Sequence, residues 1–262
     1  MKTEKYDLSD LTFIIPLRID SIDRLENILF ATNYILEYFQ TNIIVWEADE
    51  RNTMLLQKLI NPNIKHIFHE DHDPIFYRTK YINTIVKTVD TPYIAIWDAD
   101  VIVQKEQIIS SVKLLRRKKA DFVYPYKDVM LNVPRCIKNI YAKIKDLSTL
   151  TQISSGLHTM YGPNALGGGF IVNRSKYIEA GMENEAYYGW GLEDGERYHR
   201  WKRLEYKVEH IEGVLFHLDH SRGVNSTFHS NDQSYIKRKE QFRIRNMSKI
   251  LLKKEVEMWH KE

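Results

Sequence analysis

Two aspartates, Asp98 and Asp100, stand directly after an apolar segment at residues 93–97, with Ala99 between them. A hard divalent cation prefers oxygen ligands, and two close carboxylates supply them together with a phosphorylated ligand, whose charge the ion would neutralise. A bare Asp-x-Asp occurs often by chance and is by itself more typical of a turn or a helix cap. Its position at the end of an apolar segment favours the metal site.

Two histidines, His217 and His220, end a late strand-like segment. In an extended chain these positions face opposite sides, so both can bind one ion only if the strand ends in a turn between them. The sequence therefore supports one histidine ligand better than two. For either histidine, a hydrogen-bonded structural role is the alternative. Imidazole beside carboxylates favours Mn²⁺ over Mg²⁺, which keeps oxygen and water ligands.

A third polar group surrounds Trp190, which lies between Gly189 and Gly191 and is followed by Glu193 and Asp194. The helix dipole alone favours acidic residues in a first helical turn. A tryptophan between glycines, however, is poor helix and strand material, and it offers a flat surface on which a sugar ring can stack. The neighbouring carboxylates could accept hydroxyl protons. The segment is typical of a sugar site.

Three cations, Arg18, Arg78 and Lys80, lie near the ends of the elements that would carry these groups. Directed into a crevice beside a metal ion, they could clamp a diphosphate. As isolated observations, they are more often surface charges. Their role therefore depends on how the fold orients them.

Strand-like and helical segments alternate through the first half. Strands at residues 11–17, 42–46, 64–68, 93–97 and 121–126 are separated by helices at 22–39, 54–60, 78–89 and 107–117. This order predicts an α/β fold with a mostly parallel central sheet, whose ligands bind beyond the carboxyl ends of the strands. We expect residues 16–18, 47–49 and 98–100 to converge there. The second half is less regular, with glycines at 167–169, a helix from Glu193 and one strand over 207–218.

The charge pattern excludes bulk nucleic-acid binding, because 38 Lys and Arg are interspersed with 35 Asp and Glu, for a net charge of +3. With Cys136 as the single cysteine, no internal disulfide can form, which suits a reducing compartment. No apolar run approaches the roughly 20 residues of a spanning helix, and the first residues do not resemble a signal peptide. We expect a soluble, cytoplasmic protein.

Six blocks of this sequence, in this order, resemble the beta-1,4-galactosyltransferase family and the related bacterial chondroitin-polymerase-type transferases, which have the GT-A fold. The blocks are FIIPLR (13–18), FYRTKYIN (76–83), IAIWDADVIV (94–103), LGGGF (166–170), YGWGLED (188–194) and HLDHSR (217–222). The last three, correctly spaced after an Asp-x-Asp, are far more specific than any one alone. The resemblance implies a Rossmann-like GT-A domain at residues 1–230, with a nucleotide-sugar half to about residue 126 and an acceptor half from about 127.

The resemblance also implies roles for single residues. Asp194 matches the catalytic base, Glu193 an acceptor-binding carboxylate, and His220 the metal-binding histidine. Together with the strand ends, the expected donor-binding residues are Pro16, Arg18, Glu47, Asp49, Phe76, Arg78, Lys80, Asn83, Asp98, Ala99 and Gly168. The expected acceptor-binding residues are Tyr188, Trp190, Gly191 and Glu193. The expected metal ligands are Asp98, Asp100, His217 and His220.

Three departures from the family pattern bear on the site. The family has methionine at the position of His217 and glycine at the position of Leu192, and it has two further acids where Gly195 and Glu196 stand here. These departures affect the metal shell and the choice of acceptor.

The predicted activity is an inverting, metal-dependent transfer of a hexose or N-acetylhexosamine to a glycan hydroxyl, in bacterial surface polysaccharide synthesis. The donor would be UDP-galactose, UDP-N-acetylgalactosamine or UDP-glucose. A nucleotidyltransferase-like enzyme is one alternative, although no Gly-x-x-x-x-Gly-Lys-Ser/Thr loop is present. A non-catalytic sugar-binding protein is the other.

The last segment, residues 231–262, is predicted to form a basic helical tail, in which Lys and Arg accompany apolar residues. The favoured interpretation is a solvated helix that packs one apolar stripe on the body, and the alternative is a helix on a membrane surface. The alternative would fit a lipid-linked glycan acceptor at the inner face of the membrane.

Overall fold

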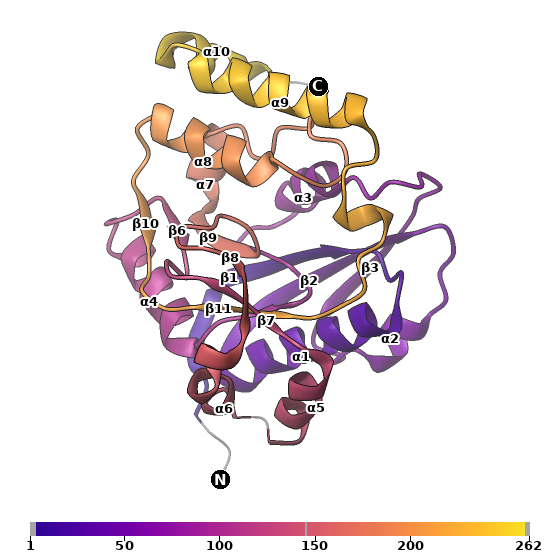
Figure 1. Ribbon diagram of the computed structural model, residues 1–262. Helices are drawn as coiled ribbons and strands as arrows, with labels where there is room; N and C mark the ends of the chain where they lie inside the picture. The colour runs from indigo at the N-terminus through magenta and orange to yellow at the C-terminus, as the bar shows by residue number, and fades with distance from the viewer. Residues whose placement is uncertain (1–3, 145, 260–262) are drawn as a thin grey trace.

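A seven-stranded sheet forms the centre of the molecule. The structure is a computed structural model, and it describes residues 4–144 and 146–259. The strands are β1 (Tyr6–Leu17), β2 (Phe39–Asp49), β3 (Lys65–Glu70), β4 (Tyr93–Trp97), β6 (Phe122–Tyr124), β9 (Gly169–Asn173) and β10 (Val208–His210). They lie in the order β10-β6-β9-β4-β1-β2-β3, and all neighbours pair in parallel except β9, which is antiparallel to β4 and β6. The predicted mostly parallel sheet is confirmed (Figure 1).

Helices cover both faces of this sheet (Figure 1). They are α1 (Ile22–Tyr38), α2 (Leu55–Leu59), α3 (Arg78–Val86), α4 (Lys105–Arg116), α7 (Arg174–Glu179) and α8 (Glu193–Arg203). Phe13 and Ile15 of β1 belong to the core shared with α1 and α4, whereas Ile14 belongs to the core shared with α3, α7 and α8. Because alternate residues of a strand face opposite sides, one continuous apolar run serves both layers.

A smaller four-stranded sheet, which the sequence pattern did not predict, carries part of the site. Its strands β5 (Val101–Ile102), β7 (Met130–Val133), β8 (His158–Tyr161) and β11 (Leu215–Leu218) lie in the order β5-β11-β7-β8. Apolar residues of this sheet pack with α5 (Arg135–Ile144) and α6 (Ser148–Gln152). Short 3₁₀ turns, η1 (Ser154–Gly156) and η2 (Val224–Ser226), complete the second half. Since β5 begins directly after Asp100, this sheet starts where the Asp-x-Asp segment leaves the main sheet.

The prediction of one strand over residues 207–218 is wrong. The segment divides into β10, in the main sheet, and β11, in the smaller one. The chain turns at Gly213, whose φ of +124° is open to glycine and whose Cβ, if present, would lie 2.8 Å from the Gln107 side chain. Gln107 in turn donates to the carbonyl of Val214. An apolar run can therefore hide a change of sheet when a single glycine permits it.

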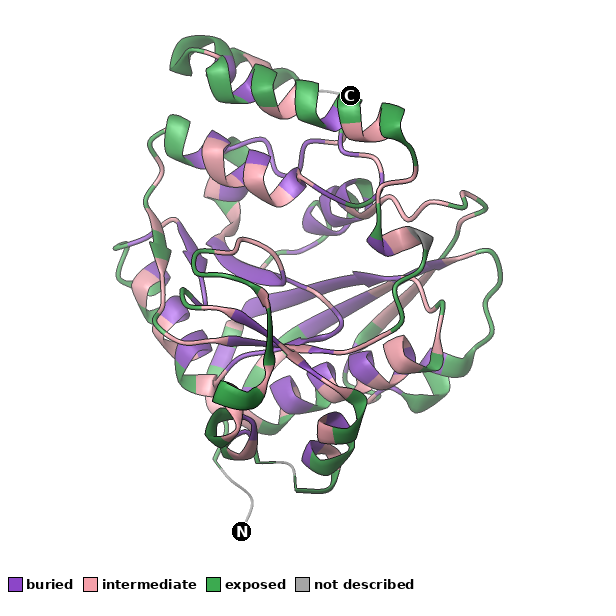
Figure 2. Ribbon diagram, viewed as in Figure 1, coloured by how far each residue is buried: buried purple, intermediate pink, exposed green. Residues whose placement is uncertain are grey.

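The predicted helical tail consists of α9 (Asn231–Asn246) and α10 (Lys249–Met258), each capped by a serine side chain, Ser230 or Ser248. The two helices lie side by side over α8 at one end of the molecule, with exposed residues along their outer side (Figures 1 and 2). The favoured interpretation of a helix packed on the body is confirmed, with Ile244, Leu252 and Val256 buried. Within residues 4–144 and 146–259, no helix is both long and apolar enough to span a bilayer.

Candidate active site

The Asp-x-Asp turn is held by one side-chain contact across it and by backbone contacts from two other segments. The indole nitrogen of Trp97, at the end of β4, donates to the carbonyl of Val101 across the turn. The amide of Asp98 donates to the carbonyl of Gly168 at 2.9 Å, and the amide of Leu218 donates to the carbonyl of Asp100 at 2.7 Å. The turn is therefore fixed relative to both β9 and β11.

Asp100, His217 and His220 form a cluster with metal-ligand geometry, in which one ligand atom of each lies within 4.8 Å of the others. The Nε2 atoms of His217 and His220 lie 3.9 and 3.1 Å from Oδ2 of Asp100. His217 lies within β11 and His220 lies beyond its end at Leu218, so the alternation of an extended strand no longer separates the two side chains. Although no turn is assigned between them, both histidines are placed to share one ion with Asp100.

The other ring nitrogens of these histidines are held by the protein. Nδ1 of His217 is 3.2 Å from Oδ1 of Asn132, and Nδ1 of His220 is 2.8 Å from the carbonyl of Ser221. Such contacts orient an imidazole so that its free nitrogen faces a metal. Burial would raise the pKa of Asp100, but the two histidines and Arg24 hold that pKa well below its ordinary value. The carboxylate stays charged, as a ligand must.

Asp98 is paired with Arg78, whose guanidinium donates to Oδ1 at 2.6 Å. Burial alone would lower the pKa of Arg78, but the nearby carboxylates of Asp98, Asp194 and Glu193 raise it. A second nitrogen of Arg78, NH1, is buried and has no hydrogen-bond partner among the described residues. It is available to an anionic ligand, because an unsatisfied buried donor is costly unless a ligand accepts from it.

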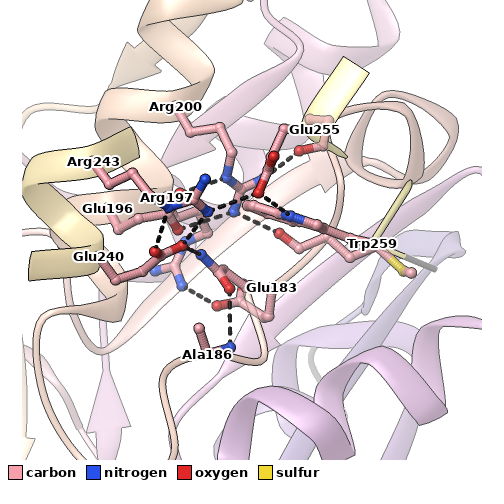
Figure 3. Close-up of polar contacts among 12 residues, drawn as sticks. Glu183, Ala186, Glu196, Arg197, Arg200, Glu240, Arg243, Glu255 and Trp259 are labelled. Atoms are coloured by element: carbon pink, nitrogen blue, oxygen red, sulfur yellow. Dashed lines mark hydrogen bonds and ion pairs between the residues drawn. The ribbon is translucent and has the colours of Figure 1, made fainter. Parts of the chain in front are cut away.

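Asp194 lies in the first turn of α8 and is tied to the core through Arg197. One guanidinium nitrogen of Arg197 donates to Oδ1 of Asp194. Another donates to Oε2 of Glu183 at 2.8 Å, and both of these residues are labelled in Figure 3. Arg197 is itself only 1% exposed, and it packs over the rings of Phe170 and Trp201. Oδ2 of Asp194 lies beside Gly167, where an added Cβ would come within 3.1 Å. The carboxylate is therefore held on one side and confined on the other.

Glu193 is buried beside Asp194, and its Oε2 has no hydrogen-bond partner among the described residues. Burial, with a further contribution from the charge of Asp194, raises the pKa of Glu193 to about 7. A ligand hydroxyl or amide N–H that donates to Oε2 would satisfy this carboxyl, so Glu193 is suited to bind a polar ligand.

Trp190 is 36% exposed, and its ring meets the edge of Phe228 at a centroid distance of 5.4 Å. Its carbonyl accepts a hydrogen bond of 2.7 Å from Nζ of Lys237, a fully buried residue of α9. The tail therefore holds the Trp190 loop in place. Burial lowers the pKa of Lys237, and loss of its amine would leave the Trp190 carbonyl without this donor.

These groups share one cavity of about 430 Å³. Most of the sequence-predicted site residues line it. They are Pro16, Arg18, Phe76, Arg78, Asp98, Ala99, Asp100, Gly168, Trp190, Gly191, Glu193, Asp194, His217 and His220. The metal cluster, the acidic residues and the exposed tryptophan therefore face the same space.

Five predicted residues are not among the cavity-lining residues. Glu47 contacts His66 at 2.8 Å, and Asp49 accepts from the amide of Glu50. Asn83 is buried and pairs with the backbone of Glu183, and the amine of the exposed Lys80 lies over the ring of Tyr77. Tyr188 donates to Asp73 at 2.5 Å. The structure does not bring these five side chains to the cavity, because each is engaged by a neighbour outside it.

Arg18 lines the cavity but is fully engaged by the protein. Its three guanidinium nitrogens donate to the carbonyls of Ala48 and Asp73 and to the carboxylate of Asp71, at 2.6–2.9 Å. Arg18 therefore joins the end of β2 to the loop that precedes Phe76. This bonding favours a role in positioning the Phe76 wall of the cavity over a direct clamp on phosphate.

Sequence reasoning missed several cavity residues, above all Arg24. Arg24 contacts Asp20 at 2.8 Å and Ser226 at 2.9 Å, and lies 3.8 Å from Oδ2 of Asp100. Arg222 also lines the cavity. The spacing of Asp20 and Arg24, one helical turn apart at the start of α1, was a visible signal. Ser226 and Phe228 lie beyond the last family-like block and carried no signal.

The region that carries the site is similar to known galactosyltransferases. A family model described as the N-terminal domain of galactosyltransferase matches residues 151–222, which include Gly168, Trp190, Asp194 and both histidines. A comparison of the sequence with curated proteins found no match. The match covers the three sequence blocks that were the most specific.

Three solved glycosyltransferase structures are similar to this chain over most of its length. The catalytic domain of Drosophila beta1,4galactosyltransferase 7 in complex with xylobiose is 17% identical, and the similarity covers 87% of this chain and 79% of that chain at a TM-score of 0.51. A mutant of the Drosophila enzyme with manganese, UDP-Gal and xylobiose is 15% identical, with 86% and 78% covered at 0.55. GalNAc-T7 with UDP, GalNAc and Mn²⁺ is 13% identical, with 83% and 45% covered at 0.56. Residues 151–222 are therefore galactosyltransferase-like, and the chain has the GT-A glycosyltransferase fold.

Proposed function

We propose that this protein is an inverting glycosyltransferase that depends on a divalent metal ion and uses a UDP-sugar donor. The observation that carries the proposal is the convergence of Asp100, His217 and His220 on one point, in the same cavity as Asp194 and Trp190. The similar Drosophila enzyme was solved with manganese, UDP-Gal and xylobiose, which supports the same classes of cofactor, donor and acceptor here.

The chemistry of the cluster fits Mn²⁺ better than Mg²⁺. One carboxylate and two imidazoles, each with its second nitrogen already held, form a mixed oxygen and nitrogen ligand set. When bound there, the ion would supply positive charge to the diphosphate that leaves the sugar. Asp98 is paired with Arg78, and we assign Asp98 to the donor rather than to the ion.

The residues of the chain would then divide the remaining work. Arg78 offers its unpartnered NH1 to a phosphate oxygen. Trp190 presents its exposed ring to a sugar, and Glu193 accepts from a hydroxyl of the acceptor. Asp194 takes the proton of the attacking hydroxyl on Oδ2, while Arg197 holds Oδ1. Attack from the face opposite the leaving diphosphate inverts the anomeric carbon.

The finer assignments remain part of the proposal. The proposed donor sugar is one of galactose, N-acetylgalactosamine and glucose. The three stay together in the proposal because discrimination among them depends on contacts to one hydroxyl or acetamido group. The acceptor is a glycan hydroxyl, and the proposed setting is synthesis of a bacterial surface polysaccharide in the cytoplasm.

The test is a screen of UDP-sugars against mono- and disaccharides, with Mn²⁺, with Mg²⁺ and with a chelator. We expect one UDP-hexose to give a disaccharide or trisaccharide product and free UDP, with Mn²⁺ as the better ion. Sugar binding without product, for every donor and ion, would favour the non-catalytic alternative. Release of pyrophosphate from nucleoside triphosphates would favour a nucleotidyltransferase.

A further inference from the structure

The two sides of the C-terminal helices differ in kind. The inner side of α9 carries the buried Lys237 and Ile244, and that of α10 carries Leu252 and Val256. In α9, Tyr235 and Phe242 are two turns apart on the opposite side, with exposed fractions of 68% and 71%. The buried residues of the inner side therefore hold the two helices to the body, whereas large apolar side chains on the other side face outward.

The outer side of α10 repeats this pattern. Leu251 and Met258 are also two turns apart, and they are 57% and 62% exposed. Ile236 and Ile250 add further exposed apolar surface. Single exposed apolar residues are normal on a protein surface, but a concentration of them on one pair of helices marks an interaction surface.

Cations lie between these apolar residues. Arg238 and Lys239 are exposed between Tyr235 and Phe242, and Lys254 is exposed between Leu251 and Met258. None of the three cations forms an ion pair with a described residue. The acids Glu240 and Glu255 are engaged by Arg243, which links α9 to α10 (Figure 3). The exposed acids Asp232 and Glu257 reduce the positive charge of this side but do not cancel it.

We propose that the outer face of α9 and α10, defined by Tyr235, Arg238, Lys239, Phe242, Leu251 and Met258, docks on an anionic lipid bilayer. Exposed aromatic and aliphatic side chains with free cations between them match the interface of such a bilayer, where the apolar groups enter the acyl boundary and the cations meet the headgroups. A protein partner or a second copy would need an acidic surface of its own to match these cations.

The inner side of α9 gives the docking a consequence for the proposed activity. Lys237 binds the carbonyl of Trp190 directly, so the helix that would lie on the bilayer also holds the loop proposed to bind the acceptor. Docking would bring this loop close to the headgroups. An acceptor attached to a lipid fits this arrangement; this part rests on the proposed function, whereas the docking itself does not.

The experiment is flotation of the purified full-length chain with vesicles of phosphatidylcholine, with and without phosphatidylglycerol, at low and high salt. We expect binding to the anionic vesicles at low salt and weak binding to the neutral ones or at high salt. Replacing Arg238 and Lys239 with Glu should lower binding by about tenfold or more, and Tyr235→Ser with Phe242→Ser should also lower it. The matched control is Lys58→Glu with Leu59→Ser on the exposed helix α2, which should bind as the wild type does.

Circular dichroism and the melting temperature verify that the variants are folded. Failure of the wild type to float with anionic vesicles at low salt overturns the proposal, and so does equal flotation of the control and the tail variants. A dimer in sedimentation velocity without lipid that dissociates in Phe242→Ser would assign the surface to self-association instead. Because no donor or acceptor is present, a negative result here leaves the proposed transferase activity to be judged by the sugar screen.

Discussion

Asp100 and Glu193 line the same cavity and are equally buried, at 7% and 8% exposure, yet their surroundings give them opposite properties. Burial would raise both pKa values. Around Asp100, His217, His220 and Arg24 outweigh burial and lower the pKa. Around Glu193, the charge of Asp194 adds to burial, and the pKa rises to about 7. The metal end of the cavity, which Asp100 and the two histidines form, thus keeps a charge that can bind a cation. The acid end, which Glu193 and Asp194 form, tolerates a neutral acid that can bind hydroxyls. Residue type alone does not fix a role; the neighbours from other segments do.

The substitution expected to separate the functions of the two ends of the cavity most clearly is Asp194→Asn. The amide keeps the shape of the side chain but cannot take a proton, so we expect transfer to fall by about a thousandfold. Binding of Mn²⁺ and UDP, measured by calorimetry, should change little because the metal end is intact. Transfer at the wild-type rate would remove Asp194 as the base.

The converse change is Asp100→Ala. It leaves two buried imidazoles without their carboxylate, and we expect Mn²⁺ affinity in the presence of UDP to fall by at least about a hundredfold. Asn132→Ala, which only releases Nδ1 of His217, should cost less, about tenfold. Unchanged Mn²⁺ affinity in Asp100→Ala would show that the ion binds elsewhere.

Lys237→Met tests whether the tail belongs to the acid end. It removes the buried donor to the Trp190 carbonyl, at a cost of about 1–3 kcal/mol. We expect the KM for the acceptor to rise, while slow hydrolysis of the donor in the absence of acceptor stays near the wild-type rate. Lys239→Met, two residues along on the exposed side, is the matched control. An equal loss of both reactions would mean that the variant merely disturbs the fold.

The raised pKa of Glu193 predicts a pH dependence of stability. The ordinary pKa is 4.5 and the folded value is about 7, so the folded state holds a proton between these values that the unfolded state releases. The contribution of Glu193 is therefore complete below about pH 4.5 and is lost as pH rises toward 7, by at most about 1.4 kcal/mol per pH unit. Glu193→Gln should flatten this slope in urea unfolding at pH 5, 6 and 7. An identical slope in the variant would contradict the assignment.

The smallest effect is expected at Leu192, the N-cap residue that precedes α8, which has a φ of +73° where the related family has glycine. This backbone conformation costs a residue with a Cβ about 1–2 kcal/mol, and a glycine would avoid that cost. Part of the benefit is offset because glycine gives the unfolded chain more conformational freedom. Leu192→Gly should raise the free energy of unfolding by up to about 1 kcal/mol, measured by urea titration. A drop in stability would mean that the leucine side chain packs more usefully than its backbone strain costs.

The first half of the fold could be predicted because its periodicities are long and clear. The strand at Tyr93–Trp97 has the predicted bounds, and the helix from Ile22 ends within one residue of its predicted end. The second half could not be predicted in the same way. Its strands are as short as three residues, as in β10, and they pair with segments far along the chain. No local pattern indicates that Leu215–Leu218 leaves the main sheet.

The candidate site divides along the same line. Blocks of sequence that resemble a family indicated Asp100, Asp194 and His220, because such blocks record chemistry directly, whereas His217 was indicated only by its place beside His220 at the end of a strand. Arg197 and Lys237 were missed because their importance depends on packing, whereas Arg24 was missed although its spacing from Asp20 was a visible signal. Nothing in the sequence indicates that Arg197 packs over two aromatic rings, or that a lysine of the tail donates to the carbonyl of Trp190.

The hydrogen bond from the amide of Leu218 to the carbonyl of Asp100 joins the two sides of the ligand cluster through the main chain alone. The backbone thus sets the distance between the segment that carries Asp100 and the segment that carries the two histidines. The side chains on these two segments can therefore vary without a change in that distance. This arrangement makes the cluster a candidate for altered metal selectivity. Exchanging His217 for a thioether or a carboxylate would change the softness of the ligand set while leaving its scaffold intact, so that one fold could be adapted to ions of different availability.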